Sequence, residues 1–313
     1  SNIIRCEQLT ERYLKRIETF DKTTGLNAIT YVNPNALPKA RQLDRAFAKS
    51  DSMKKLHCIP IILKDNFDTA DMPTEAGSVA LRGSLPPDDA FMVKRLREQD
   101  AIIIAKSNMG EWAFSPHRTI SSTHGETRNA YDLTRVPAGS SGGAASAVAA
   151  NFGIVGMGTD TGNSIRGPAS HLSLVGIRST IGATSRDGIV PLLRNRDVAG
   201  PLTRTVEDAA IVYGILAGYD SADPVTQASK GRVKLDYTRY LNAEGLSGAR
   251  LGVLRSLVDT ASADDEVQRL FDEAVADLHD AGAVIVDPFS IPDFDRLRDA
   301  TGFCSRFRYD LKN

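Results

Sequence analysis

Residues 139–168 read GSSGGAASAVAANFGIVGMGTDTGNSIRGP, and the fold can be worked out from this stretch. Two loops rich in glycine and serine, 139–143 and 158–164, flank an alanine-rich segment that suits a helix packed closely on a sheet. The apolar run 153–158 suits a buried strand. Open α/β sheets place functional sites just beyond the carboxyl ends of their strands. We therefore expect the two serine-containing loops to meet at one edge of a sheet.

The sequence before this stretch alternates between strand and helix patterns. Residues 59–64 and 101–105 are short apolar runs typical of buried strands, and an amphipathic segment at 88–99 lies between them. Residues 1–50 carry apolar side chains at helical spacing in two segments. Strands that are apolar on both faces belong to sheets covered on both sides. We predict an α/β fold with a mostly parallel or mixed central sheet and helices on both faces.

The sequence after this stretch contains one more helix and then changes character. Thr205-Val-Glu-Asp208 has the form of a capping box and predicts a helix that runs through residue 216. Residues 220–248 are polar and irregular, and strand, helix and strand patterns follow at 251–254, 267–278 and 284–286. We expect one α/β domain over residues 1–313, with a catalytic core at about residues 50–220. Residues 221–313 form either the far side of the same sheet or a subdomain.

Residues 306–313 resemble the start of a helix that is cut short. Phe307 and Tyr309 lie in this stretch and Phe303 lies just before it, and monomeric proteins rarely expose large apolar patches. We expect that the C-terminal part is incomplete. An additional C-terminal segment or a second copy of the chain, in a homo-oligomer, would then cover this surface.

Charge and cysteine content argue against several classes of protein. The chain has 38 basic and 39 acidic side chains and a net charge of −1, so it has no electrostatic reason to bind nucleic acid or an anionic membrane. Cys6, Cys58 and Cys304 are odd in number and far apart, which favours a reducing compartment over a disulfide framework and does not support a zinc site. We expect a cytoplasmic protein with no metal or organic cofactor and no direct nucleic-acid or membrane partner.

Lys64, Ser140 and Ser164 are the candidate catalytic residues. Lys64 ends an apolar strand and both serines lie in glycine-rich loops, so the three side chains can converge at adjacent strand ends. A serine hydroxyl is a poor nucleophile until a base removes its proton. A lysine serves as that base only when neutral, and burial lowers its pKa from about 10.4 by disfavouring the ammonium. Ser140 can relay the proton between the two.

The loop that contains Ser164 has further candidate functions. The backbone N–H groups of residues 161–164, namely Thr161, Gly162, Asn163 and Ser164, are candidates for an oxyanion hole, and a helix that begins near Ser164 would add the positive end of its dipole. Asp160 and Arg166 flank the loop. We expect them to support it through hydrogen bonds to its backbone.

These motifs resemble the signature of the amidase family. Members carry a GSSGG loop and, 24 residues after its first serine, the nucleophile of a D-x-G-G-S-x-R run, and here Ser140 and Ser164 are 24 residues apart. The resemblance covers about residues 5–220. It implies an amidohydrolase of small-molecule amides, with Ser164 forming an acyl-enzyme, Lys64 as base and Ser140 as relay, held by a cis Gly139–Ser140 peptide. Ser141 would support this set.

The chain departs from the family pattern in three respects. Asn163 stands where the family usually has a glycine, and because Asn tolerates positive φ the loop can keep its shape, while its side chain would narrow or polarise the pocket. Cys58 also replaces a usual glycine. Family members normally continue well past residue 313.

The sequence also allows two other functions and one other nucleophile. The chain could be the amidase-like subunit of a tRNA-dependent amidotransferase, or a non-catalytic relic of the fold, although the retention of Lys64, Ser140 and Ser164 together argues against a relic. Residues 139–143 also fit the G-x-S-x-G elbow of α/β-hydrolases, which would make Ser141 the nucleophile. That elbow requires a strand directly before it, and residues 135–137 do not have a strand pattern.

Overall fold

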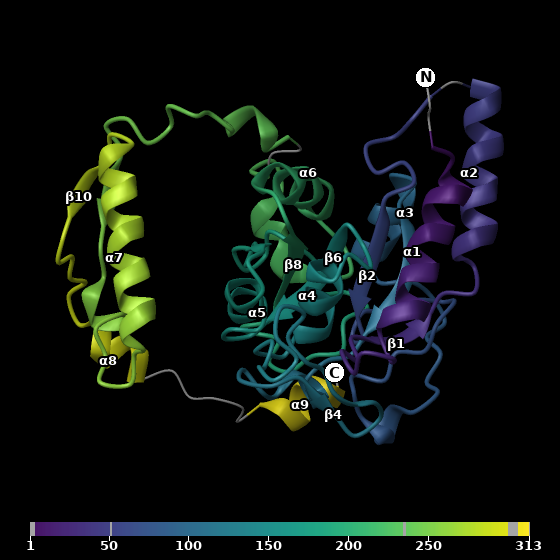
Figure 1. Ribbon diagram of the computed structural model, residues 1–313, viewed down its shortest axis with the longest axis horizontal. Coiled ribbons are helices and arrows are strands. Elements are labelled where there is room, and N and C mark those ends of the chain that lie inside the picture. Colours follow the sequence, from purple (N-terminus) through teal and green to yellow (C-terminus); the bar gives the residue numbers. More distant parts are fainter. Residues whose placement is uncertain (1–3, 51, 234–235, 300–305, 313) are drawn as a thin grey trace. The chain divides into compact units, whose positions relative to one another are not determined.

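The computed structural model describes residues 4–50, 52–233, 236–299 and 306–312 (Figure 1). The chain divides into two compact units. The first comprises residues 1–238 and 306–313, and the second comprises residues 239–305. All the candidate catalytic residues therefore lie in the first unit.

The first unit is built on a six-stranded mixed sheet. The pairs β3–β2 and β2–β6 are parallel, whereas β1–β3, β6–β8 and β8–β7 are antiparallel. The prediction of an α/β fold with a mixed central sheet is confirmed, because β3, β2, β6 and β7 run in one direction whereas β1 and β8 run in the other. The spatial order is β1 (Ile29–Val32), β3 (Ile102–Ser107), β2 (Pro60–Lys64), β6 (Val155–Asp160), β8 (Val198–Thr203) and β7 (Val175–Gly176).

Helices cover both faces of this sheet, as predicted. All five residues of β2 are buried, because successive side chains of a strand point to opposite faces. Ile61 and Leu63 join the apolar cluster that contains residues of α3 and α6, and Ile62 joins the cluster that contains residues of α1, α2 and α4. The bounds are α1 (Cys6–Phe20), α2 (Ala36–Ser50), α3 (Phe91–Glu98), α4 (Gly142–Ala149) and α6 (Val206–Leu216).

The helix boundaries follow local sequence signals. Thr205 is the N-cap of α6, and its Oγ1 accepts a hydrogen bond from the backbone N–H of Asp208 at 3.0 Å, as the capping box predicts. The helix expected near Ser164 is α5 (Arg166–His171), which begins two residues later. A two-stranded hairpin, β4 (Ile120–Ser121) and β5 (Gly125–Glu126), lies before the serine loops.

The second unit has a simple strand and helix arrangement. Its two strands, β9 (Arg250–Gly252) and β10 (Val284–Val286), pair in parallel and are joined through α7 (Asp265–Asp280). Asp264 caps α7 by accepting from the backbone N–H of Glu266 at 2.9 Å. A short helix, α8 (Phe294–Asp299), follows β10. The predicted strand, helix and strand patterns are thus present here.

The chain returns to the first unit in α9 (Phe307–Lys312). The Phe307 ring lies 5.9 Å from that of Trp112 and 6.0 Å from that of Phe114. The expectation that the aromatic residues near the end lack a partner is therefore wrong for Phe307, because the 3₁₀ turn around Trp112 contacts it. Tyr309 is 60% exposed, and Phe303 lies outside the described residues.

The cysteines depart from expectation. Cys6, at the start of α1, forms a disulfide with Cys58, in the turn before β2. The prediction against disulfide pairing is wrong for these two residues, because the fold brings together positions 52 residues apart in sequence. Within the described part of the chain, no helix is long and apolar enough to span a bilayer.

Candidate active site

The last residue of β2 is Lys64, which is completely buried. Its Nζ donates to Ser140 Oγ at 2.8 Å and to Thr159 Oγ1 at 2.7 Å. Thr159 lies on β6, the parallel neighbour of β2, so the sheet register itself sets the Lys64–Thr159 contact. The structure thus brings together Lys64 and Ser140, two of the three predicted catalytic residues.

The environment of Lys64 favours the neutral amine. Desolvation by burial lowers the pKa of Lys64 from 10.5 to about 7, while the negative charges of Asp197 and Asp160 act in the opposite direction. A neutral amine has a lone pair and can accept a proton from the Ser140 hydroxyl, which a lysine in water cannot do at neutral pH. A substantial fraction of Lys64 is therefore neutral at neutral pH, and the neutral amine is the form that a general base requires.

The first serine loop is fixed tightly beside Lys64. Its Gly139–Ser140 peptide is cis, as expected. Ser141 is buried, and its Oγ donates to the Thr159 carbonyl oxygen at 3.2 Å. Gly143 is required here, because a Cβ at this position would lie 2.0 Å from the Asn108 carbonyl oxygen. The engagement of Ser141 with β6, and the absence of a strand at residues 134–138, disfavour the elbow interpretation.

The second serine loop, residues 161–164, has free backbone donors. Within the described residues, the N–H groups of Thr161, Gly162, Asn163 and Ser164 make no hydrogen bond. Ser164 is 4% exposed, and no hydrogen bond joins its hydroxyl to Lys64 or Ser140 in the described part of the chain. Free N–H groups next to a serine are what an oxyanion hole needs.

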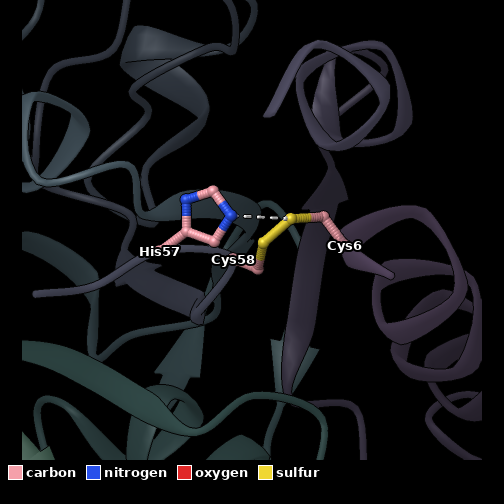
Figure 2. A group of neighbouring side chains, drawn as sticks. All are labelled: Cys6, His57 and Cys58. Atoms are coloured by element: carbon pink, nitrogen blue, oxygen red, sulfur yellow. Dashed lines mark hydrogen bonds between the residues drawn. A yellow bond between two sulfur atoms is a disulfide. The ribbon is translucent and has the colours of Figure 1, made fainter. Parts of the chain in front are cut away.

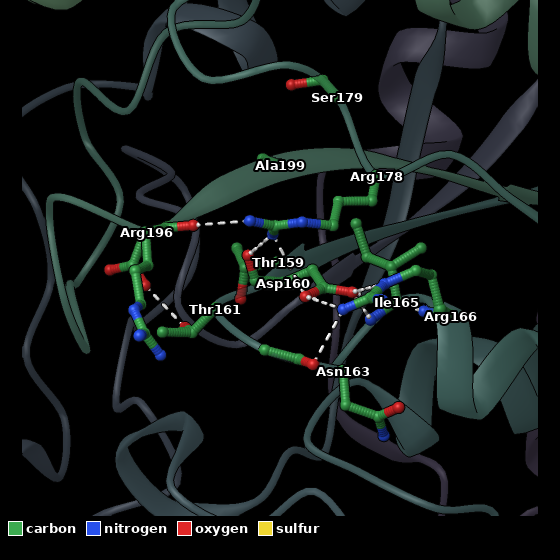
Figure 3. A network of polar contacts seen from close by, with 12 residues as sticks. Thr159, Asp160, Thr161, Asn163, Ile165, Arg166, Arg178, Ser179, Arg196 and Ala199 are labelled. Carbon is green, nitrogen blue, oxygen red and sulfur yellow. Dashed lines mark hydrogen bonds and ion pairs between the residues drawn. The ribbon is translucent and has the colours of Figure 1, made fainter. Parts of the chain in front are cut away.

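The shape of this loop depends on Asp160, the fully buried last residue of β6 (Figure 3). Its Oδ2 accepts from the backbone N–H of Ile165 at 3.1 Å and from Arg166 Nε at 3.1 Å, and its Oδ1 accepts from Arg178 Nη1 at 3.1 Å. Arg166 Nη2 also donates to the Gly162 carbonyl oxygen at 2.7 Å. Asp160 and Arg166 thus hydrogen-bond to each other and to the backbone of this loop.

The backbone conformation of Asn163 differs from the one expected. It is not among the residues with positive φ, so tolerance of that conformation is not what it contributes. Its Nδ2 donates to the carbonyl oxygens of Pro116 at 3.2 Å and Gly139 at 3.5 Å. Asn163 therefore ties the second serine loop to the first.

Sequence reasoning missed several residues that shape the site. Asp197 accepts from Thr161 Oγ1 at 2.5 Å, and burial raises its pKa. Asn66 Nδ2 donates to Thr159 Oγ1 at 3.1 Å, so the hydroxyl that contacts Lys64 has a second partner. Arg178 lies 18 residues from Asp160 in sequence. Asp160 and Thr161, which follow Thr159 in sequence, indicate polar contacts at this strand end. No local sequence pattern indicates Asp197 or Arg178.

A cavity lies close to these side chains. A small space of about 10 Å³ is lined by Thr159, Thr161 and Asp197, among others, and shares Arg186 and Ile189 with a larger cavity of about 580 Å³. Within the described residues, the one group with the arrangement of metal ligands is Cys6, His57 and Cys58, and it includes none of the catalytic candidates.

Comparison with known proteins is consistent with this geometry. A family model described as Amidase matches residues 8–306. One subunit of glutamyl-tRNA(Gln) amidotransferase, from Streptomyces coelicolor, is 38% identical over 92% of this chain and 56% of that protein. A probable amidase of Arabidopsis thaliana is 37% identical over 94% of this chain and 57% of that protein. The native peptide amidase from Stenotrophomonas maltophilia has a TM-score of 0.87 at 41% identity, over 95% of this chain and 61% of that one.

The match to the family covers more of the chain than the sequence motifs did. The chain spans 56% to 61% of the length of these relatives, and the family match continues past residue 220 to residue 306. The mixed sheet, the paired serine loops and the buried lysine fall inside the matched region. The chain belongs to the amidase signature family.

Proposed function

We propose that this chain carries the catalytic core of an amidohydrolase, in which Ser164 is the nucleophile, Ser140 the proton relay and Lys64 the base. One observation carries the proposal. The fully buried Lys64, with its pKa lowered to about 7, lies 2.8 Å from Ser140 Oγ. Burying a charged lysine costs free energy, so a fully buried lysine beside a hydroxyl of a glycine-rich loop points to a function for its neutral form.

The proposed reaction uses these three residues in turn. Neutral Lys64 takes the proton of Ser140, which takes that of Ser164 as its Oγ attacks the amide carbonyl. The free N–H groups of residues 161–164 stabilise the oxyanion of the tetrahedral intermediate. The proton then returns through Ser140 to the leaving ammonia or amine, and the acyl-Ser164 ester forms. Water, activated by the same base, releases the acid. These steps need no metal or organic cofactor.

Covalent labelling tests the nucleophile. A fluorophosphonate probe is expected to modify Ser164, because it lies beside free backbone donors. The measurement is peptide mass mapping after labelling, with Ser164→Ala as the negative variant and Ser141→Ala as the matched control that should still be labelled. Modification of Ser141 in place of Ser164 would restore the elbow interpretation and remove this proposal.

The pH dependence of catalysis tests the base. Because the Lys64 pKa is about 7 and only the neutral amine accepts a proton, kcat/KM should rise with pH through one limb near pH 7 and level off above it. A profile that is flat between pH 6 and about pH 9 would contradict the assignment. A screen of aliphatic, aryl and peptide amides and urea derivatives, with ammonia release as readout, would supply the substrate for this measurement.

A second candidate function is the amidase-like subunit of a tRNA-dependent amidotransferase. It is favoured by the similarity to the glutamyl-tRNA(Gln) amidotransferase subunit from Streptomyces coelicolor. Co-purification with further subunits, and no hydrolysis by the isolated protein, would support it. A non-catalytic relic is disfavoured by the preserved Lys64–Ser140 contact.

The cytoplasmic location is also a proposal. It rests on the three cysteines of the chain, whose odd number and wide spacing in sequence favour a reducing compartment. The Cys6–Cys58 disulfide bears on it, because stable disulfides are rare in the cytosol whereas transient ones occur there. Cell fractionation tests it, and recovery of the protein from an oxidising compartment would contradict it.

A further inference from the structure

A second group of reactive side chains lies outside the proposed catalytic set, where α1 meets the turn before β2 (Figure 2). Cys6 is the first residue of α1, and its Sγ is bonded to that of Cys58. His57 Nε2 lies 3.5 Å from Cys6 Sγ. The sulfur and nitrogen atoms of these three residues all lie within 4.8 Å of one another.

The orientation of the His57 ring is fixed by its neighbours. Its Nδ1 lies 3.5 Å from Asp100 Oδ2, and its ring centroid lies 5.8 Å from that of Phe47. Asp100 in turn pairs with Lys54 Nζ at 3.6 Å. A carboxylate that accepts from Nδ1–H selects the tautomer whose Nε2 is free to accept a proton. Nε2 is then the ring nitrogen with a lone pair, and it faces Cys6 Sγ.

Cys58 has a backbone conformation that favours glycine. Its φ is 66°, a value that glycine adopts without steric cost. The backbone N–H of Cys58 donates to the Asp100 carbonyl oxygen at 3.1 Å and holds the turn in place. A side chain retained under such backbone strain points to a role for that side chain. The Cys6–Cys58 Cα separation of 5.1 Å lies within the range that a disulfide requires.

The start of α1 does not by itself activate Cys6. Asp44 already accepts from the backbone N–H of Cys6 at 2.8 Å and from that of Glu7 at 3.0 Å. Its carboxylate therefore caps the first turn and offsets the positive end of the helix dipole. This leaves His57 as the group that can take up the thiol proton.

We propose that Cys6, Cys58 and His57 form a reversible dithiol–disulfide site that reacts with small-molecule disulfides. His57 Nε2 takes the proton of Cys6, and the thiolate attacks one sulfur of the disulfide RSSR. A Cys6–SR mixed disulfide forms and RS⁻ leaves, taking the proton from His57. Cys58 then gives its proton to His57, its thiolate attacks Cys6 Sγ, and the expelled second RS⁻ takes that proton from His57. Two protein thiols are oxidised, and one disulfide is reduced to two thiols.

A cavity borders the group at His57. A cavity of about 280 Å³ is lined by His57 and Asp100, together with Phe47 and Lys54. Cys6 and Cys58 are themselves buried, at 3% and 8% exposure. The site therefore suits compact disulfides that enter beside His57, and hydroxyethyl disulfide is the probe we select.

The experiment isolates the first step. In a Cys58→Gly variant, glycine keeps the positive φ and Cys6 has no second thiol to resolve the mixed disulfide. Cys304, outside the described residues, is replaced by Ser so that it cannot exchange. After reduction and removal of the reductant, hydroxyethyl disulfide should form a stable adduct on Cys6, found by peptide mass mapping. With Cys58 present, the same treatment should give the Cys6–Cys58 cross-linked peptide.

Matched variants test the role of His57. His57→Gln should slow adduct formation on Cys6 about tenfold or more. His279→Gln, which changes an exposed histidine that also faces a carboxylate (Asp280), should leave the rate unchanged. Far-UV circular dichroism confirms that each variant is folded.

Three outcomes would overturn the proposal. The first is no adduct on Cys6 in the folded variant, and the second is an equal rate in His57→Gln. The third is that Zn²⁺ added to the reduced protein binds one ion per chain and blocks both thiols. In that case the group is a metal site, because the same three residues also have the arrangement of metal ligands.

Discussion

The Lys64→Met variant is expected to lose about three to four orders of magnitude in kcat/KM, because it removes the base from the proposed mechanism. The same change should not destabilise the fold. The pKa of Lys64 is lowered from 10.5 to about 7, so near pH 7 and below the folded state carries a penalty for the buried ammonium. That penalty is on the order of 5 kcal/mol at 1.36 kcal/mol per pKa unit, and methionine avoids it. The unfolding free energy in urea should stay equal or rise.

The size of this effect on the unfolding free energy depends on pH. Between pH 7 and pH 10.5, the two pKa values of Lys64, the unfolded chain binds more protons at this residue than the folded chain does. The contribution of Lys64 to stability therefore improves as pH rises through this window, and the advantage of Lys64→Met should shrink with it.

Lys106 offers a matched control for this experiment. It lies on the neighbouring strand β3, is also completely buried, and donates to Thr74 Oγ1 at 3.0 Å. Burial lowers the pKa of Lys106 to about 8. Lys106→Met should change kcat/KM of the folded protein by less than about tenfold, because it does not touch Ser140. An equal loss of activity in both variants would mean that burial of a lysine, not its contact with Ser140, explains the effect.

The Asp160→Ala variant is expected to cost about 3–5 kcal/mol of unfolding free energy, as for other buried ion pairs that lose one partner. Asp160 is completely buried and ends β6. Its loss would leave the buried N–H of Ile165 without an acceptor and Arg178 without its carboxylate. Urea unfolding followed by circular dichroism measures the change.

Asp132→Ala is the control for this second prediction. Asp132 also pairs with an arginine, Arg135 at 3.8 Å, but its side chain is 53% exposed. Its replacement should change the unfolding free energy by about 0.5 kcal/mol or less. A change below about 1 kcal/mol in Asp160→Ala would show that the Asp160 network does not stabilise the loop.

The sequence predicted the parts of the fold that have strong local patterns. β2 and β3 are fully buried, and each begins with a continuous apolar run that is followed by a lysine, Lys64 or Lys106. In contrast, β1 is four residues long and of mixed burial, and β7 consists of two half-buried residues. Strand direction has no local pattern either, and β8, which pairs antiparallel with β6, contains Gly200 and Pro201 and is not a continuous apolar run.

In the candidate site, too, residues with a local sequence pattern were predicted and contacts between distant residues were not. Lys64, Ser140 and Ser164 could be selected because glycine-rich loops and an apolar strand surround them in sequence. The contact of Thr161 with Asp197 joins residues 36 apart, and only the folded sheet brings them together. The disulfide was missed for the same reason, since its partners lie on α1 and on the turn before β2.

The order of strands in the sheet also has a consequence during protein synthesis. Lys64 and Thr159 are 95 residues apart, an interval that takes the ribosome about 5–20 s at about 5–20 residues per second. Until β6 emerges, β2 lacks its partner on one side, and Ile61, Ile62 and Leu63 cannot be fully covered. Nascent chains that end before residue 155 should therefore bind chaperones, and slow translation of residues 107–155 should lower the yield of folded protein.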